Sequence, residues 1–294
     1  MIDGFYTVSR RANTYKQPRG GFIKFKSFNQ IRFEGNAELL SPVLEPANPS
    51  IVGLAVDYLT RYMLGVPKEE AFKISLRGVE IAQKMEDQQE KRYYNSLSVF
   101  QKMKYKFKNR KKDNANRIIN MGNKMLSQIN GLDIDSIQSV CELVTFDVFY
   151  RNPMHARITC YDMSTFVEEN ECINIRTMVQ RSLKFFEEYG PVTATDFTFD
   201  GGYTSTVFNG DGDYLTKDCL WDMKVSKNKI TPKHSLQILM YWIMGQHSGQ
   251  EIFKSITKIG VFNPKLNMAF QIDIKDIPPE VIKEVEREVI GYEA

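Results

Sequence analysis

The spacing of apolar and polar residues predicts a helical first part of the chain. Residues 1–35 mix aromatic, basic and glycine residues, which indicates short strands and turns. Three prolines between residues 42 and 49 mark an extended connection. Residues 50–64 have helical spacing, with Ser50 as the expected N-cap and an end near Gly65 and Pro67. A long polar helical pattern follows from 68 to 140, interrupted around Asn95 and Asn114. Another helix is expected at 175–189.

After residue 190 the pattern changes to short β-rich segments. Segments 192–200 and 203–208 are joined through Asp200-Gly201-Gly202, which predicts a β-hairpin. A Gly/Asp-rich connection, a strand at 219–225, a helix from about 233 to 246, and strands at 256–262 and 268–274 follow. A charged helix begins at Pro278-Pro279. The pattern predicts a mixed α/β fold in three parts: a basic segment with the first helix (1–65), a largely helical region (66–190), and an α/β core (191–294).

Composition adds little to this picture. A chain of 294 residues can bury a sizeable core. No apolar run approaches the roughly 18 residues of a membrane span, and the basic N-terminus lacks an apolar signal region. We therefore expect a cytoplasmic protein that does not contact membranes. Its four cysteines, at 141, 160, 172 and 219, show no CxxC spacing, which favours reduced thiols.

The charge is unevenly distributed, although the net value is only +3. Residues 101–112 carry seven basic side chains and no acid, with Tyr105 and Phe107 between them. This pattern suits phosphate contacts and base stacking; a solvated helix face is the alternative. The candidate nucleic-acid-binding residues are Lys102, Lys104, Lys106, Lys108, Arg110, Lys111 and Lys112.

The candidate chemistry lies in the α/β core. In a strand, residues two apart share a face, so Asp222 and Lys224 project together. A tight turn through Lys217-Asp218 would place Asp213 on the adjacent strand, beside Asp222. Two close carboxylates repel each other, and a bound Mg²⁺ relieves that repulsion. The backbone carbonyl of Met223 is a plausible third ligand. Together these groups could bind a metal ion against a phosphodiester.

A helix after this strand adds two polar side chains. Gln237 and Tyr241 lie four residues apart, on one helix face, from which they could bond the acids or the substrate backbone. His234, one turn earlier, is either a phosphate contact or a surface histidine at the helix start. Asp211 either contacts a second metal ion or supports a turn at Gly210 and Gly212.

The ordered set Gly210-x-x-Asp213, Asp222-x-Lys224 and Gln237-x-x-x-Tyr241 resembles the RecB-like branch of the PD-(D/E)XK nuclease superfamily. The resemblance covers roughly residues 192–262 and extends at most to the helix at 50–64. It implies a restriction-endonuclease-like αβββαβ core, dependence on Mg²⁺ or Mn²⁺, and hydrolysis of DNA phosphodiesters. Asp213 and Asp222 match the metal-binding acids, Lys224 the catalytic lysine, and Gln237 and Tyr241 the accessory motif. Asp273-Ile274-Lys275 repeats the D-x-K spacing, but no GxxD precedes it and no QxxxY follows it.

Two features depart from the family pattern. The branch often carries a histidine or glutamate on an earlier helix, where this chain offers Asp57 in Gly53-Leu54-Ala55-Val56-Asp57. Asp57 is therefore a candidate third acidic ligand; Glu45, Glu187 and Glu188 are rivals. Some relatives bind an iron–sulfur cluster through four cysteines with a clustered C-terminal trio. The four cysteines here lack that spacing, so no cluster is expected.

These observations predict a metal-dependent nuclease that acts on DNA, exonuclease-like in its action; RNA is the alternative substrate. Accessory recombination, repair or phage proteins are expected partners. Two other hypotheses remain at this point. One is a catalytically inactive nucleic-acid-binding protein on the same scaffold. The other is a protein-interaction component of a phage or mobile-element system, in which the basic stretches contact an acidic partner.

Overall fold

The computed structural model describes residues 5–34, 38–39, 48–109, 116–153, 156 and 167–293, and shows a mixed α/β protein. The chain folds into two compact units: Met1–Glu38 with Gln180–Ala294, and Leu39–Val179. This division differs from the expected three segments, because the N-terminal residues pack with the C-terminal part. Among the described residues, no helix combines the length and apolar character needed to cross a membrane.

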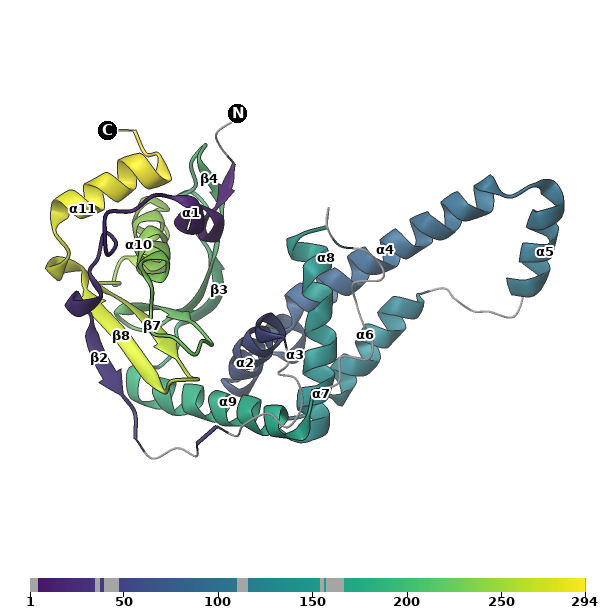
Figure 1. Cartoon of the computed structure of the whole chain (residues 1–294), viewed down its shortest axis with the longest axis horizontal. Helices are drawn as coiled ribbons and strands as arrows, with labels where there is room; N and C mark the ends of the chain where they lie inside the picture. Colours follow the sequence, from purple (N-terminus) through teal and green to yellow (C-terminus); the bar gives the residue numbers. More distant parts are fainter. Residues whose placement is uncertain are drawn as a thin grey trace. The chain divides into compact units, whose positions relative to one another are not determined.

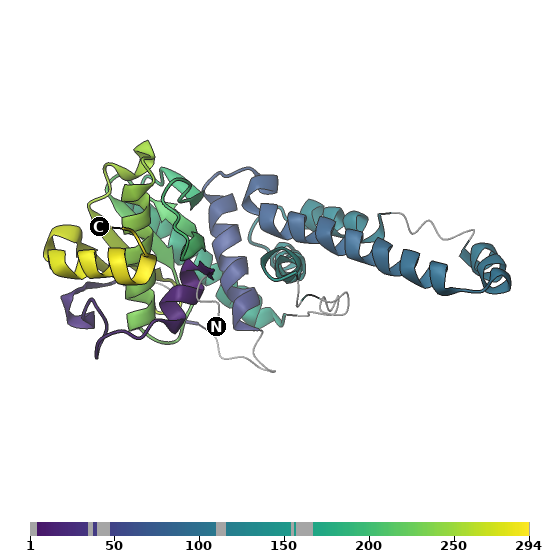
Figure 2. The same ribbon diagram turned by 90° about the horizontal axis from the view of Figure 1, so that it is seen from above.

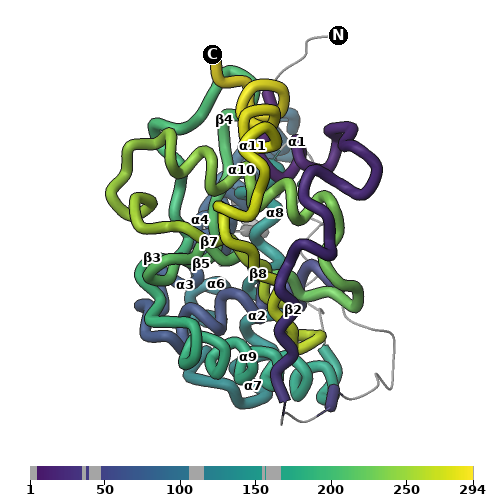
Figure 3. Tube along the Cα trace, turned by 90° about the vertical axis from the view of Figure 1, so that its left-hand side faces the viewer, coloured from purple at the N-terminus to yellow at the C-terminus, as the bar shows by residue number. Residues whose placement is uncertain are grey.

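The first unit contains a six-stranded mixed sheet (Figures 1 and 2). Its strands, in spatial order, are β2 (Asn29–Arg32), β8 (Met268–Asp273), β7 (Lys258–Asn263), β6 (Cys219–Met223), β5 (Asp211–Leu215) and β3 (Ala194–Thr198). Only β6 and β7 pair in parallel; the other neighbours are antiparallel. Parallel neighbours need a crossover connection, and α10 (Pro232–His247) provides it. Figure 3 shows β2, from the N-terminal part of the chain, beside β8, from its C-terminal part.

Helices cover both faces of this sheet. On one face, Phe185 in the last part of α9 (Glu169–Tyr189) stacks on Phe262 at 4.1 Å and meets Trp221 edge-on at 4.8 Å. On the other face, α10 and α1 (Val8–Thr14) pack on apolar residues that include Leu215 and Leu220. Alternate residues of β6 therefore point to different helical layers, as the period of two predicts.

The expected hairpin between residues 192 and 208 is wrong. β3 pairs with β5, whereas β4 (Val207–Asn209) pairs in parallel with β1 (Tyr6–Thr7) in a separate two-stranded sheet. The two glycines instead allow close contact with α10. A Cβ on Gly202 would lie 2.1 Å from the Met244 carbonyl oxygen, and Gly201 has φ +91°.

Other local predictions need correction. Gly212 lies in strand β5 and Gly210 directly precedes that strand; Asp211 pairs with Thr198. Neither glycine has a positive φ; a Cβ on Gly212 would lie 2.1 Å from the Phe197 ring, so packing explains this glycine. The N-terminal segment contains helix α1, which the sequence pattern did not predict. The N-cap of the first long helix is Asn48, which accepts a hydrogen bond from the Ser50 N–H, and not Ser50 itself.

The second unit is helical, as predicted, with a break after residue 96; the interruption expected around Asn114 lies outside the described residues. Its helices are α2 (Pro49–Met63), α3 (Lys68–Ala71), α4 (Lys73–Ser96), α5 (Val99–Asn109), α6 (Arg117–Gln128), α7 (Ile134–Leu143), α8 (Asp147–Arg151) and the first part of α9. Short 3₁₀ helices lie at Val144–Phe146 here, and at Phe25–Ser27, Glu251–Phe253 and Ile274–Asp276 in the first unit. The first unit ends with α11 (Pro279–Glu284) and a π-helical turn, Val285–Ile290.

A buried carboxylate joins three elements of the helical unit. Asp147, at the start of α8, accepts hydrogen bonds from the hydroxyls of Tyr58 on α2 and Ser75 on α4, each at 2.5 Å. Arg151 lies one turn along α8, 3.4 Å from the same carboxylate. Burial raises the pKa of Asp147, while these donors and the guanidinium act in the opposite direction. The network therefore fixes α2, α4 and α8 relative to one another.

Two glycines in the helical unit should respond in opposite ways to alanine. A Cβ on Gly78 in α4 would lie 2.0 Å from the Phe146 carbonyl oxygen, whereas no atom lies within 4 Å of the corresponding position at Gly53 in α2. We expect Gly78→Ala to lower the free energy of unfolding by about 2 kcal/mol. Gly53→Ala should raise it by about 0.5–1 kcal/mol, since alanine favours a helix interior. Urea unfolding monitored by circular dichroism measures both, and equal effects would contradict the packing argument.

Candidate functional site

The two expected metal-binding acids face each other across adjacent strands. Tyr214 pairs with Trp221 and Leu215 with Leu220 in the antiparallel β5–β6 ladder. One further step in this register brings Asp213 opposite Asp222, with both side chains on the face of the sheet that α10 covers. Directly opposed residues in such a ladder have Cβ atoms about 5 Å apart. The strand register therefore brings the two carboxylates to one place, as the sequence predicted.

The lysine joins this pair through a direct contact. Lys224 Nζ lies 2.9 Å from the Asp222 carboxylate. The Asp222 side chain is only 2% exposed, while that of Lys224 is 28% exposed. Asp213 accepts a hydrogen bond from the backbone N–H of Met223 at 2.8 Å, which ties its carboxylate to the end of β6. Asp222 is thus the more deeply buried partner of this ion pair.

The electrostatic environment keeps Lys224 charged. Burial alone would lower the pKa of its ammonium, but the carboxylates of Asp222 and Asp213 outweigh burial and raise that pKa above its ordinary value. Lys224 therefore remains protonated throughout the neutral range. A persistent positive charge beside two acids can interact with a phosphate oxygen but cannot act as a general base there.

Helix α10 contributes the expected amide and phenol to the same face. Gln237 Nε2 donates to the Tyr241 hydroxyl at 2.8 Å and to Ser9 Oγ of α1 at 3.3 Å. Burial, and after it the charge of Asp222, raises the pKa of the Tyr241 phenol, which therefore keeps its proton. Tyr241 can accept from Gln237 and still donate. The phenol lies close enough to Asp222, Lys224 and Asp213 for all three charges to affect it.

Packing fixes the ring of Tyr241. It stacks on Phe199 with a centroid distance of 5.0 Å and an interplanar angle of 18°. A Cβ on Gly210 would lie 2.6 Å from Val8 Cγ2 and 3.5 Å from Tyr241 Cε1. The glycine of the GxxD segment therefore makes room for α1 and for this ring. It acts through packing rather than through turn geometry.

His234 lies at the start of α10, where its Nδ1 accepts from the Thr231 N–H at 3.3 Å. Burial, and then the positive charges of Lys224 and Lys233, lowers its pKa to about 4. His234 is therefore neutral at pH 7. A neutral imidazole with this cap role favours a structural histidine over a phosphate contact.

The lowered pKa of His234 makes the fold sensitive to acid. Between about pH 6.5, where an unfolded histidine titrates, and pH 4, the unfolded chain binds the extra proton, so stability falls as the pH falls. His234→Gln keeps a side-chain acceptor at this capping-box position and cannot titrate. We expect its free energy of unfolding to decline less than that of the wild type between pH 7 and 4.5. Urea unfolding of both proteins at pH 7 and 4.5 measures this difference. An equal loss of stability in His234→Gln and the wild type would contradict the prediction.

The candidates for a third acidic ligand have different local surroundings. Asp57 belongs to the helical unit, where both of its oxygens bond the Arg61 guanidinium, at 2.6 and 3.2 Å. Glu187 and Glu188 are exposed on α9, which covers the sheet face opposite the two aspartates. Glu45 lies outside the described residues. Within the part of the chain that the structure describes, no group of three or more His, Cys, Asp or Glu side chains is placed to bind a metal ion.

The basic run lies in the helical unit and is described only in part. Lys102 lies 5.5 Å over the Tyr94 ring and Lys104 lies 4.5 Å over the Phe100 ring. The side chains of Lys106 and Lys108 are outside the described ones, as are residues Arg110, Lys111 and Lys112 altogether. Tyr105 packs against Tyr93 and Tyr94, so its ring is used within the protein.

Two contacts were missed from the sequence. Ser9 bonds Gln237 from 228 positions away, and only the unpredicted helix α1 makes that contact possible. Lys224 also donates its backbone N–H to the Phe262 carbonyl, at 2.9 Å, which continues the β6–β7 pairing beyond the strand end. No local signal marks either contact, because both depend on which elements become neighbours.

Comparisons with known proteins return no match. No family model, no curated protein and no solved structure matches the chain. The functional assignment therefore depends on the residues and their geometry.

Proposed function

We propose that this protein is a metal-dependent DNA nuclease that hydrolyses phosphodiester bonds with a metal-activated water, in an exonuclease-like manner. One observation carries the proposal. Asp213 and Asp222 lie opposite each other on adjacent strands, and Lys224 contacts Asp222 at 2.9 Å on the same face. A buried charge costs stability unless it is paired or used, so three charges gathered here need a reason. Binding of a divalent cation and a phosphate supplies one.

The residues present fit a hard divalent cation. Mg²⁺ commonly binds one or two carboxylates and completes its octahedron with water and substrate phosphate oxygens. Asp213 and Asp222 offer two carboxylates, and the backbone carbonyl of Met223 at the end of β6 is a candidate third oxygen. The absence of a third acid among the described residues is compatible with this chemistry. When bound, Mg²⁺ or Mn²⁺ would polarise the scissile phosphate and lower the pKa of a bound water.

The protein's own groups have distinct proposed roles. The Lys224 ammonium, kept charged by the two aspartates, would stabilise negative charge that develops on the phosphate and position the attacking water. The contact with Met223 N–H fixes the direction of the Asp213 carboxylate. Tyr241 keeps its proton and is held by Gln237, so it can donate a hydrogen bond to the acids or to the DNA backbone.

The order of elements supports the same proposal. Helix α9 precedes the antiparallel strands β3, β5 and β6, and α10 then leads to β7, which pairs in parallel with β6. This is the αβββαβ order that a restriction-endonuclease-like core of the PD-(D/E)XK type requires. The three sequence motifs lie on β5, β6 and α10, in the order that the resemblance implies.

A direct test uses the purified full-length chain with linear duplex, closed circular and single-stranded DNA, in EDTA, Mg²⁺ or Mn²⁺. We expect cleavage only with a divalent cation, and degradation of linear but not of closed circular DNA. Asp222→Asn should abolish cleavage because it removes the charge of a metal-binding acid. DNA retention without cleavage under every condition would instead support the inactive binding scaffold. Binding to a protein partner that nucleic acid cannot displace, without cleavage, would support the interaction component.

A further inference from the structure

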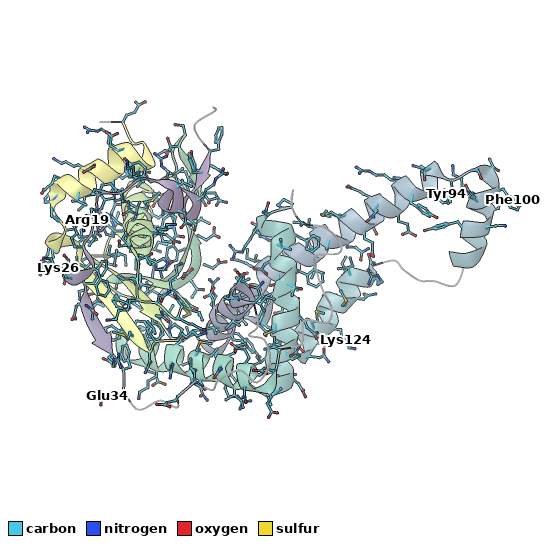
Figure 4. All side chains as sticks on the ribbon, in the orientation of Figure 1. Arg19, Lys26, Glu34, Tyr94, Phe100 and Lys124 are labelled. Carbon is cyan, nitrogen blue, oxygen red and sulfur yellow. The ribbon has the colours of Figure 1, made fainter. Side chains whose placement is uncertain are left out.

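The outer end of the α4–α5 pair exposes a group of large apolar side chains. Figures 1 and 2 place α5 at the far end of α4, away from α7 and α8. There Val99 is 79% exposed, Phe100 66% and Met103 68%. Figure 4 labels Phe100 at this end of the helical unit. Large apolar side chains that gather on one surface usually mark a binding site.

A half-buried tyrosine determines which face of α5 points outward. Tyr105 packs its ring against Tyr93 at 5.9 Å and Tyr94 at 5.7 Å, and its hydroxyl bonds Glu90. At 100° per residue, Val99, Phe100 and Met103 lie on the side of α5 opposite Tyr105. The contact with α4 therefore leaves these three side chains facing solvent.

Two lysines of α5 flank this apolar surface. Of the nearby acids, Glu86 pairs with Arg117, whereas Asp87 and Glu90 accept hydrogen bonds from the neutral side chains of Gln83 and Tyr105. At 100° per residue Lys102 and Lys104 lie on the two sides of the outward face of α5, and in the part of the chain that the structure describes no ion pair includes either of them. We call these two cations together with Val99, Phe100 and Met103 the tip surface. Its charge is complementary to a polyanion.

We propose that the tip surface binds unpaired nucleotides of a DNA strand, with Phe100 stacking on a base and Lys102 and Lys104 contacting phosphates. This inference rests on the proposed nuclease function, and it specifies substrate with single-stranded segments. Lys104 Nζ lies 4.5 Å over one face of the Phe100 ring, which leaves the other face for a base. Sites for single-stranded DNA combine exposed aromatic rings with a basic surround in this way.

The same features fit a lipid surface less well. An interfacial helix buries a continuous apolar face along its length, with a basic face above it. Here the described outward apolar residues of α5 are Val99, Phe100 and Met103, while Tyr105 is packed on α4. One exposed ring with a lysine ammonium over one face suits a stacked base better than a bilayer.

The test measures binding without cleavage, on the full-length chain in EDTA. Fluorescence anisotropy compares a 20-nucleotide oligothymidine with a closed-end duplex hairpin. We expect Phe100→Ala to weaken binding to the oligothymidine about tenfold, the loss of about one stacked base. Binding to the duplex should change less than twofold. Phe100→Trp should keep the affinity, whereas Phe100→Leu, which retains apolar volume but cannot stack, should lose it.

Two controls distinguish the possible outcomes. Phe208→Ala removes another exposed ring, in the first unit, and should leave oligothymidine binding unchanged. Vesicles with phosphatidylserine test the lipid alternative. Three results would each overturn the proposal. Phe100→Ala could bind the oligothymidine as tightly as the wild type, or Phe100→Leu could keep the wild-type affinity. The third is binding that depends on Phe100 for vesicles but not for the oligothymidine. This assay measures binding without cleavage, so it tests the tip surface even if the protein shows no nuclease activity. If the protein cleaves DNA but binds the oligothymidine independently of Phe100, only the proposal for the tip surface is rejected.

Discussion

Lys224→Ala should lower kcat for DNA hydrolysis by about 10³-fold, with a much smaller change in KM. Removing one preorganised group that stabilises transition-state charge typically costs a factor of about 10²–10³. Lys224 is such a group in the proposed mechanism, since its ammonium lies 2.9 Å from Asp222 and stays charged at neutral pH. The effect should appear mainly in kcat, because the charge that Lys224 meets grows during the reaction. Initial rates on linear DNA in saturating Mg²⁺ measure it.

The chain contains a matched control for this substitution. Lys275 follows Asp273 with the same D-x-K spacing, at the end of β8, yet it is exposed and lies in a short 3₁₀ helix. Lys275→Ala should leave kcat within a factor of two. Circular dichroism and thermal unfolding of both variants exclude a loss of fold. Wild-type turnover by the Lys224 variant, or an equal loss in the Lys275 variant, would remove Lys224 from the mechanism.

Asp147→Ala should lower the free energy of unfolding of the helical unit by about 3 kcal/mol. The substitution leaves the buried hydroxyls of Tyr58 and Ser75 without their acceptor, and it removes the charge opposite Arg151. Each unsatisfied buried polar group costs about 1–3 kcal/mol, and breaking a buried ion pair costs about 3–5 kcal/mol. The estimate lies at the lower end because Arg151 is partly exposed. Urea unfolding at pH 7, monitored by circular dichroism, measures the change.

A second aspartate of the same unit controls for the loss of charge alone. Asp135 is exposed in the first turn of α7, and Asp135→Ala should change stability by less than about 1 kcal/mol. Asp147→Asn keeps one acceptor oxygen and should give an intermediate loss. If both aspartate-to-alanine variants unfold at the same urea concentration, the buried network contributes little to stability.

The alternation and spacing of apolar and polar residues predicted the positions of many strands and helices of the first unit. Strands β6, β7 and β8 and helix α10 lie within a few residues of their expected positions. The meeting of Asp213 and Asp222 followed from the short β5–β6 connection, because a tight turn determines which residues become neighbours. The mixed α/β class is confirmed. The nuclease assignment and the named core remain proposals.

Other features could not be predicted because they depend on distant neighbours. Gly201 and Gly202 have the composition of a hairpin turn, and only the approach of α10 shows why glycine is needed there. Helix α1 is short, and its place in the fold is set by packing against α10 rather than by its own pattern.

The discontinuity of the first unit has a consequence for how the protein is made. Strand β2 must wait for β8, the partner that pairs with it, until more than two hundred further residues have left the ribosome. The helical unit, Leu39–Val179, is meanwhile synthesised in one stretch and can close its own core first. During translation the early strand edge therefore stays unpaired, and because β2 is short and polar, this edge is a poor template for pairing with other chains in that interval.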